Sequence, residues 1–556
     1  MTHTRFKEPK SAQSLKSPIL KNSYSRFRLA VANAVGTLLL AVAWLGATHG
    51  YWENPDFAFI GDHMRPHLQI DTFLNDGIST LPRLSRLPSL FPDYLDALIS
   101  APLKTTYNSW LFLNAFLNGV WLSASGALLV SRISRSSYWQ ACISTSLAVA
   151  VCSLHLEGFG FYAGLSTMPI HHGGNLTATL IMLAWALSIS HHKVNKWILS
   201  TTFVGCALFS FDNLFFITTY LLPLLILTTS RLVLANSLSP EIRKLRSFSL
   251  ASASGCLAGY IVIQFIPTEC TNALTLDIAT FQESLRYHLW PRQGEGDRLL
   301  LYSLIAYSAF VVTAFKYSTQ QTGEFITIKS TAAQIGLGML APMLMLSLFS
   351  DNRYSAGKYI LPALLLTPFL ASGTALVLYK KSIASASVHL ASCLAVFSIV
   401  MSISLPQASG AWQDARSWKP FDKLDGINNI RQGLYLIDSS LDPLALEMYT
   451  NHRIRAVPIA SDGNPWLWHY SQNDIRSSLS SATVSGLIAG DNLDAGKLSS
   501  IAERYGQIKM TESSKTGASA RIITIYNLSD PSKATDYLLQ LASEDSSIGC
   551  DGFRLD

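Results

Sequence analysis

The sequence predicts an α-helical polytopic membrane protein with about 11 transmembrane helices and a C-terminal extracytoplasmic α/β domain. The chain of 556 residues is 49% hydrophobic and only 14% charged, and its mean hydropathy is +0.26. Average soluble domains carry about 25% charged residues. Long apolar segments recur up to about residue 405, and short alternating strands and helices replace them after that point.

A membrane-spanning helix needs about 20 mostly apolar residues. Segments of this kind lie near residues 28–48, 110–131, 139–156, 173–190, 196–211, 213–230, 248–267, 299–315, 334–349, 359–378 and 388–405. The first segment is longer than the apolar core of a signal peptide and lacks a clear small-residue cleavage site. It is therefore interpreted as a span.

The distribution of Lys and Arg predicts the orientation of the chain. Residues 1–27 form a basic, Ser- and Lys-rich arm, which favours a disordered cytoplasmic segment. Each loop that would then face the cytoplasm carries Lys or Arg, as in "SHHKVNKW" and "YKKS". Most acidic groups fall on the opposite side. We therefore expect a multi-pass protein of the bacterial inner (cytoplasmic) membrane, with a cytoplasmic N-terminus and a periplasmic or extracellular C-terminal domain.

The segment 407–556 is predicted to be a domain of its own, outside the transmembrane region 28–406. "GLYLIDS", "RIRAVPIA", "TVSGLIAGDN" and "ARIITIYNL" are typical of strands, whereas "DPLALEMYTNH" and "LDAGKLSSIAERYG" have helical periodicity. The alternation of the two patterns predicts a layered α/β structure. About 150 residues are enough to bury a separate hydrophobic core.

The first external loop, residues 49–109, is much longer than a connection between two spans requires. "HMRPHLQIDTFLND" and "FPDYLDALISAPL" predict two amphipathic helices, and Asp62 precedes the first of them. Amphipathic helices lie on the membrane surface or pack against the ends of spans. We expect their polar faces to border a cavity at the boundary between membrane and water.

This layout resembles the GT-C superfamily of integral membrane glycosyltransferases. The first-loop stretch "GDHMRPHLQIDTFLNDG" is similar to that family's acidic-residue pattern, with Asp62 in the acidic position and His63 where Glu is common. "NRYSAGKYILPALLLTPFLA" resembles a late span of the family, and "DPLALEMYTNHRIRAVPI" resembles a segment of its external domain. In layout the chain resembles the protein mannosyltransferase and aminoarabinose transferase types.

The resemblance implies transfer of a sugar from a polyprenyl-phosphate carrier to an extracytoplasmic acceptor of the cell envelope. The implied partners are the lipid bilayer, the polyprenyl-phosphate-sugar donor, and a glycan, lipid or protein acceptor. The sequence contains no Gly-rich nucleotide loop, no Walker motif and no GxSxG elbow, so it does not support an ATP or nucleotide-sugar enzyme. No nucleic-acid partner is expected.

Transfer of this kind needs a base that activates the acceptor hydroxyl. Asp62 is the first candidate, followed by Asp71 and by Glu157, since the family often has an acidic residue in its second external loop. Each has a plainer interpretation. Asp62 is also placed to cap a helix, because Asp is a preferred N-cap residue, and Asp71 is equally consistent with a solvated helix face.

A divalent cation, Mg²⁺ or Mn²⁺, is a further hypothesis, and no other cofactor is predicted. Asp62, His63 and Glu157 are the candidate metal ligands. The spacing of these residues does not require a metal, and interfacial histidines hydrogen-bonded to the backbone are the alternative.

The departing phosphate needs cationic groups. Arg353 and Lys358 are the main candidates, because Arg binds phosphate through a bidentate fork and Lys as a point charge. The alternative is that they are snorkelling residues at a span end. The remaining substrate-binding candidates lie in the external loops, namely Arg65, His63, His171, His172, Arg292 and Tyr354.

Two other classes of function stay open. A transporter or flippase of lipid-linked glycans would have inverted repeats and charges or broken helices near mid-membrane. Asp212 in "FSFDNLFF" is one such charge, although it also fits a turn between two helices. A polymerase or ligase of the same lipid-linked material is the other alternative. The identities of the sugar and the acceptor remain open.

Overall fold

The structure is a computed structural model of the full chain, and part of the chain is described. The described residues are 18–52, 90–156, 159–167, 171–235, 239–265, 299–317, 324–346, 365–382, 386–417, 431–438, 453–459, 482–489, 495–515 and 522–543, with positions 66, 67, 70, 71, 73, 74, 446, 447, 450, 463 and 479.

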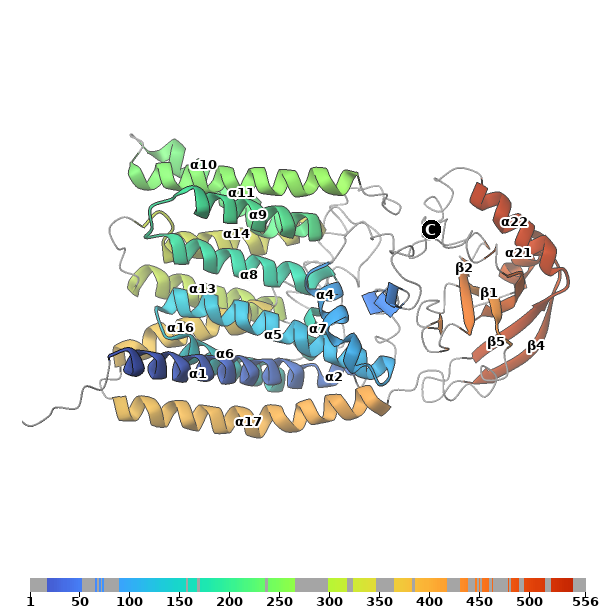
Figure 1. The fold of residues 1–556 in the computed structure, drawn as a ribbon, viewed down its shortest axis with the longest axis horizontal. Helices are drawn as coiled ribbons and strands as arrows, with labels where there is room; N and C mark the ends of the chain where they lie inside the picture. Colours follow the sequence, from blue (N-terminus) through green and yellow to red (C-terminus); the bar gives the residue numbers. More distant parts are fainter. Residues whose placement is uncertain are drawn as a thin grey trace, which may run out of the picture.

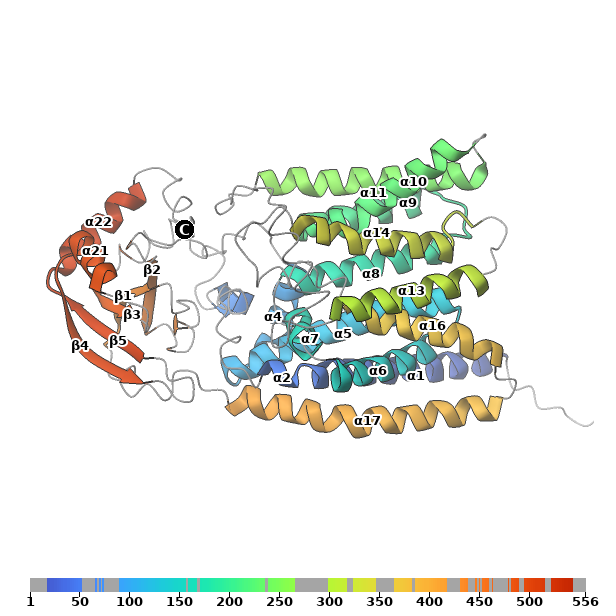
Figure 2. The same ribbon diagram turned by 180° about the vertical axis from the view of Figure 1, so that it is seen from behind.

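Most of the described chain forms a bundle of long helices that run roughly side by side (Figures 1 and 2). The long helices are α1 (Pro18–Ala47), α5 (Tyr107–Ser134), α6 (Tyr138–His155), α8 (His171–Ile189), α9 (Lys196–Asp212), α10 (Leu222–Leu234), α11 (Pro240–Gln264), α13 (Leu299–Tyr317), α14 (Ile328–Leu346), α16 (Thr367–Ser382) and α17 (Ala386–Ser417).

Among the described residues, six helices are long and apolar enough to cross a membrane. The six segments are Phe27–Ala47, Tyr107–Ser134, Ile217–Leu234, Pro240–Gln264, Leu299–Tyr317 and Ser392–Asp414. Two shorter apolar helices cover Gly173–Ile189 and Thr367–Tyr379. The protein is therefore a multi-pass helical membrane protein. Helices also occupy the described parts of the other predicted ranges, but the predicted count of eleven spans is not confirmed.

Short elements gather at the end of the bundle that faces the C-terminal domain, which we call the domain end (Figure 1). They are α2 (His49–Trp52), the turn η3 (Leu90–Tyr94), α4 (Leu95–Ser100), the turn η4 (Ala101–Leu103) and α7 (Phe159–Thr167). The predicted helix "FPDYLDALISAPL" is thus confirmed in α4 and η4, whereas the backbone is extended at Phe91, near its start. Of the other predicted first-loop helix, only positions 66, 67, 70, 71, 73 and 74 are described, and these six are helical.

Local signals in the sequence explain where α5 begins and ends. Thr106 caps its start by accepting from the Ser109 backbone N–H at 3.1 Å, and the Ser109 hydroxyl accepts from the Thr106 N–H at 2.9 Å. Such a reciprocal pair satisfies amide groups that have no partner within a helix. Arg135 ends the helix in the left-handed conformation, with φ at 53°. This helix carries several side chains of the candidate site.

The bundle has one continuous hydrophobic core, and small residues let its helices approach closely. Gly126 of α5 lies against the ring of Phe369 in α16, where an added Cβ would come within 1.9 Å of a ring carbon. Gly255 and Gly259 bring α11 similarly close to the backbone of α9. Small residues at helix contacts are typical of packing between membrane helices.

The C-terminal domain contains a five-stranded mixed sheet in the order β2-β1-β3-β5-β4. The strands are β1 (Gly433–Asp438), β2 (Ile454–Ile459), β3 (Val484–Ala489), β4 (Ile508–Lys515) and β5 (Ile522–Leu528). β1 pairs in parallel with β2 and β3, whereas β5 pairs antiparallel with β3 and β4. The predicted α/β domain is confirmed at this level.

Two helices, α21 (Ala495–Tyr505) and α22 (Pro531–Ser543), cover one face of the sheet (Figure 2). The prediction included β1, β2, β3 and β5, together with α21, which is followed by Gly506 with φ at 95°. It missed β4 and α22. β4 is an edge strand with the polar sequence "IKMTESSK", so it lacks the apolar alternation that marks a buried strand. The predicted helix "DPLALEMYTNH" is described only at Leu446, Glu447 and Thr450.

Candidate functional site

Buried carboxylates meet at the domain end of the bundle. Asp93 in η3 and Asp96 in α4 are three residues apart, a spacing that places side chains on one helix face. Their exposed fractions are 2% and 0%. Asp, unlike Leu or Val, is almost never fully buried without a partner that offsets the loss of water. This pair is therefore a candidate for a functional site at the domain end of the bundle.

Two asparagines of α5 hold Asp93. The Asn118 side-chain amide donates to Oδ1 of Asp93 at 3.2 Å, and the Asn114 amide donates to the backbone carbonyl of Asp93 at 3.1 Å. Asn118 also donates to the carbonyl of Thr167, at the end of α7, at 2.9 Å. Three elements are thus fixed around one carboxyl group.

A third carboxylate comes from the end of α9. Oδ1 of Asp212 accepts from the backbone N–H of Phe91 at 3.0 Å, and the Asp212 side chain is 6% exposed. Burial raises the pKa of Asp93 well above its usual range, and the nearby negative charge of Asp212 raises it further. The hydrogen bond from Asn118 opposes this shift. Asp93 therefore holds its proton more tightly than an exposed aspartate does.

Asp96 is less strongly shifted. Burial raises its pKa from 3.8 to about 7, against the hydrogen bond that its Oδ1 accepts from the indole N–H of Trp121 at 3.0 Å. Its Oδ2 has no hydrogen-bond partner among the described residues. A carboxyl group with a pKa near 7 and one free oxygen can accept and release a proton near neutral pH.

Glycines at the start of α8 allow the site to assemble. An added Cβ on Gly174 would lie 2.8 Å from the carbonyl oxygen of Phe91, and one on Gly173 would lie 2.1 Å from that of Ser166. Any larger residue at these positions would push α8 away from η3 and α7. The "HHGGN" stretch, singled out for its histidines, therefore also matters through its glycines.

A second polar group surrounds Asp71. Its Oδ1 accepts from Nζ of Lys104 at 2.8 Å and its Oδ2 from the hydroxyl of Tyr107 at 2.6 Å. The Lys104 ammonium lies 4.0 Å from the Tyr107 ring centre and 4.9 Å from that of Trp110. Asp71 is 9% exposed, so its interpretation as a solvated residue is wrong. Both of its oxygens are engaged, and its predicted catalytic role remains a prediction.

A negative charge of the C-terminal domain lies near this second group. It is the carboxylate of Glu447, which is close enough to Tyr107, at the start of α5, for the two groups to interact electrostatically. His67 packs edge-on against Trp110, with 4.7 Å between the ring centres. The first loop and the bundle therefore meet around Tyr107 and Trp110.

Most of the predicted site residues lie outside the described part of the chain. These are Asp62, His63, Arg65, Glu157, Arg292, Arg353, Tyr354 and Lys358. His171 and His172 are described as backbone in the first turn of α8, and their side chains are not. Among the predicted catalytic residues, Asp71 is therefore the one whose surroundings the structure describes. Its partners are Lys104 and Tyr107.

No three His, Cys, Asp or Glu side chains of the described residues lie close enough together to hold a metal ion. Asp62, His63 and Glu157 are outside those residues, so the Mg²⁺ or Mn²⁺ hypothesis stays a hypothesis.

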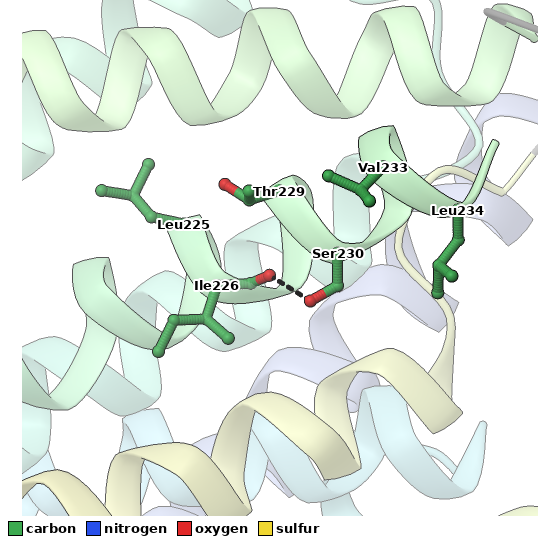
Figure 3. Close-up of a pocket in the computed structure, with 6 residues that line it drawn as sticks. All are labelled: Leu225, Ile226, Thr229, Ser230, Val233 and Leu234. Atoms are coloured by element: carbon green, nitrogen blue, oxygen red, sulfur yellow. Dashed lines mark hydrogen bonds between the residues drawn. The ribbon is translucent and has the colours of Figure 1, made fainter.

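A groove of about 570 Å³ lies elsewhere, along the second half of α10 (Figure 3). Its lining is mostly apolar and consists of Leu225, Ile226, Thr229, Ser230, Val233 and Leu234. The Ser230 hydroxyl donates to the carbonyl of Ile226 in its own helix at 2.8 Å. The groove offers no converging polar groups and is separate from the carboxylates.

The sequence reasoning missed Asp93 and Asp96 as candidates, although it placed them on a predicted amphipathic helix. The i, i+3 pair of acids in "FPDYLDALIS", inside an otherwise apolar stretch, is the signal that points to them. Asp212 was considered only as a mid-membrane charge or a turn residue.

No model of a known protein family matches the sequence, and no curated protein is significantly similar to it. The GT-C resemblance therefore rests on the layout and on the loose motifs alone.

Proposed function

We propose that this protein is a membrane glycosyltransferase that moves a sugar from a polyprenyl-phosphate carrier to an acceptor hydroxyl. The observation that carries the proposal is the Asp93–Asp96 pair, buried at one end of a multi-pass bundle. Strongly shifted carboxyl groups inside a membrane protein are functional candidates, because burying them costs stability.

In this proposal Asp96 is the general base. Its free Oδ2 takes the proton of the acceptor hydroxyl while the hydroxyl oxygen attacks the anomeric carbon of the sugar. The bond between that carbon and the carrier phosphate oxygen breaks, and polyprenyl phosphate leaves with the bonding electrons. The proton then leaves Asp96 to water. A pKa of about 7 suits both steps near neutral pH.

In this proposal Asp93 has a different role, because its raised pKa favours the protonated form. A neutral carboxylic acid can donate a hydrogen bond to a substrate oxygen. When Asp93 is protonated, Asp96 also has no full negative charge beside it. Arg353, Lys358, Arg292 and Arg65 remain the proposed phosphate-binding residues, and Asp62 and Glu157 remain alternative bases.

The test is a transfer assay with the purified full-length protein in liposomes and a panel of polyprenyl-phosphate sugars. Wild type, Asp96→Asn and Asp62→Asn are compared, and Asp536→Asn, an exposed carboxylate on α22, serves as the matched control. We expect Asp96→Asn to lower turnover by about 100-fold or more, the usual contribution of general base catalysis. Asp536→Asn should match wild type.

Two results would contradict the proposal in different ways. Turnover lost in Asp62→Asn but kept in Asp96→Asn would move the base to Asp62 and leave the transferase in place. No turnover from any donor, with movement of a labelled lipid-linked glycan across the liposome membrane, would instead identify a flippase.

A further inference from the structure

Helix α4 buries its polar side and exposes its apolar side, the reverse of an amphipathic helix at a water-facing surface. Its inward face carries Asp96, Ala97 and Ser100, all buried. Its outward side and the following turn η4 expose large apolar side chains, namely Leu95 (39%), Leu98 (44%), Ile99 (52%) and Leu103 (64%). A helix at a water-facing surface would present these two sides the other way.

Hydrogen bonds from α5 fix this orientation. The indole N–H of Trp110 donates to the carbonyl of Ala97 at 2.9 Å, and that of Trp121 donates to Oδ1 of Asp96 at 3.0 Å. Rotating α4 to bury its leucines would break both bonds and would expose a shifted carboxyl group. The outward leucines are thus a consequence of how the acidic face is held.

The exposed face continues onto a membrane span. Leu103 is followed after three residues by Tyr107, the first residue of the candidate span Tyr107–Ser134. Trp121 belongs to that span, is 36% exposed and contacts both Asp96 and the ring of Phe91. Lys104 points its ammonium back to Asp71, so among the described residues it adds no free charge to this face.

We propose that the apolar face formed by Leu95, Leu98, Ile99, Leu103 and Trp121 lies against the lipid chains of the bilayer. A contiguous exposed apolar surface needs an apolar partner, and this one is continuous with a helix that itself crosses the membrane. Helix α4 is then an interfacial helix with its side chains at the depth of the acyl chains.

This placement deepens the proposed function, on which its second part rests. A lipid-linked donor reaches Asp96 sideways from the bilayer, past the exposed face of Trp121. Its isoprenoid chain stays among the lipid chains while its sugar enters the carboxylate site.

The test replaces Leu98 or Ile99, one at a time, with an amino acid that carries a diazirine. After irradiation a diazirine inserts into whatever touches it, and mass spectrometry identifies the adduct. Met510, which is 61% exposed on β4 of the C-terminal domain, carries the same group as a control. The protein is reconstituted in vesicles of phosphatidylethanolamine and phosphatidylglycerol. Because Leu98 and Ile99 are exposed, their replacement leaves the core intact.

We expect lipid adducts to dominate at positions 98 and 99 and water adducts at position 510. Water adducts at 98 and 99 would overturn the proposal, and so would cross-links to peptides of the C-terminal domain. The readout does not depend on turnover. Lipid adducts in a protein without transferase activity would keep the membrane contact and reject the proposed function, whereas turnover without lipid adducts would do the reverse.

Discussion

The two ends of the bundle bury the same chemical group in opposite ways. At the end away from the C-terminal domain, which we call the far end, the carboxylate of Glu324 is 5% exposed and meets two basic side chains. At the domain end, Asp93 and Asp96 are buried as deeply, and their described hydrogen-bond partners are the neutral groups of Asn118 and Trp121.

The far end is arranged for stability. Glu324 accepts from Arg135 at 2.9 Å and lies 3.1 Å from Nε2 of His191. The next residue, Phe325, donates from its backbone N–H to the carbonyl of Ser190 at 3.4 Å and accepts from Arg231 at 3.0 Å. One short segment thus joins the ends of α5, α8 and α10. Paired in this way, a buried charge is stabilised by its neighbours.

At the domain end, the loss of hydration of the buried carboxyl groups is not offset by a cationic partner among the described residues, as it is at the far end. A buried carboxyl group without a cation holds its proton more tightly, which is why the pKa values of Asp93 and Asp96 are raised. The difference teaches that burial alone does not decide the charge of an acid, and that its partner does. Groups left in this state are typical of functional sites.

The largest expected effect that distinguishes the two ends is on the pH dependence of stability. The folded protein binds the Asp96 proton more tightly than the unfolded chain does, with a pKa of about 7 against 3.8. Its contribution to stability is therefore greatest below about pH 4 and is lost as the pH rises to about 7. Three pKa units correspond to about 4 kcal/mol at most. Asp96→Asn should remove the part of the slope that Asp96 contributes and leave the part that comes from Asp93.

Thermal unfolding in detergent between about pH 4.5 and 8.5 measures this slope. Asp536→Asn, with its carboxylate exposed on α22, should keep the wild-type slope. A wild-type protein whose unfolding temperature rises steadily from pH 5 to 8, or an Asp96→Asn protein with an unchanged slope, would mean that Asp96 ionises normally.

At the far end, loss of the negative charge should lower the stability of the protein. Glu324→Gln removes the negative charge that Arg135 and His191 face, so we expect it to destabilise the protein by about 2 kcal/mol. Breaking a fully buried pair costs about 3–5 kcal/mol, and the partners here are partly exposed, at 37% and 45%. The midpoint of thermal unfolding at pH 7 gives the comparison.

A matched control exists in the C-terminal domain, where Glu503 lies exposed on α21. Glu503→Gln should change stability by less than about 0.5 kcal/mol, as surface substitutions usually do. If Glu324→Gln is as mild as this control, the ion pairs at the far end contribute nothing measurable and the contrast between the two ends fails.

The sequence was sufficient to predict elements with strong periodicity. Apolar runs located the long helices, and the period-two runs located β1, β2, β3 and β5. These signals are local, because each is contained within one stretch of about 6 to 20 residues. The polar edge strand β4 gave no such signal and was missed.

The composition of the site could not be read in the same way. Asp93 meets Asn118 and Asp212, which come from two different helices. Arg135 and Glu324 are likewise joined only by the fold. A local pattern cannot show which distant helices pack together, and Asp71 was assigned to a solvated face or to catalysis because its partners Lys104 and Tyr107 were not visible in the sequence.

The smallest expected effect tests what keeps the pKa of Asp96 near 7. The indole N–H of Trp121 is the described donor to its Oδ1, and a hydrogen bond to a carboxylate favours the charged form. Trp121→Phe should therefore raise the pKa of Asp96 by about one unit, equivalent to about 1.4 kcal/mol. The midpoint of the pH-dependent loss of stability should move upward by the same amount.

Trp110→Phe is the matched control, because that indole donates to the backbone carbonyl of Ala97 instead. It should lower stability at every pH without moving the midpoint. Equal behaviour of the two variants would show that the Trp121 bond only holds α4 in place, and that burial alone sets the ionisation of Asp96.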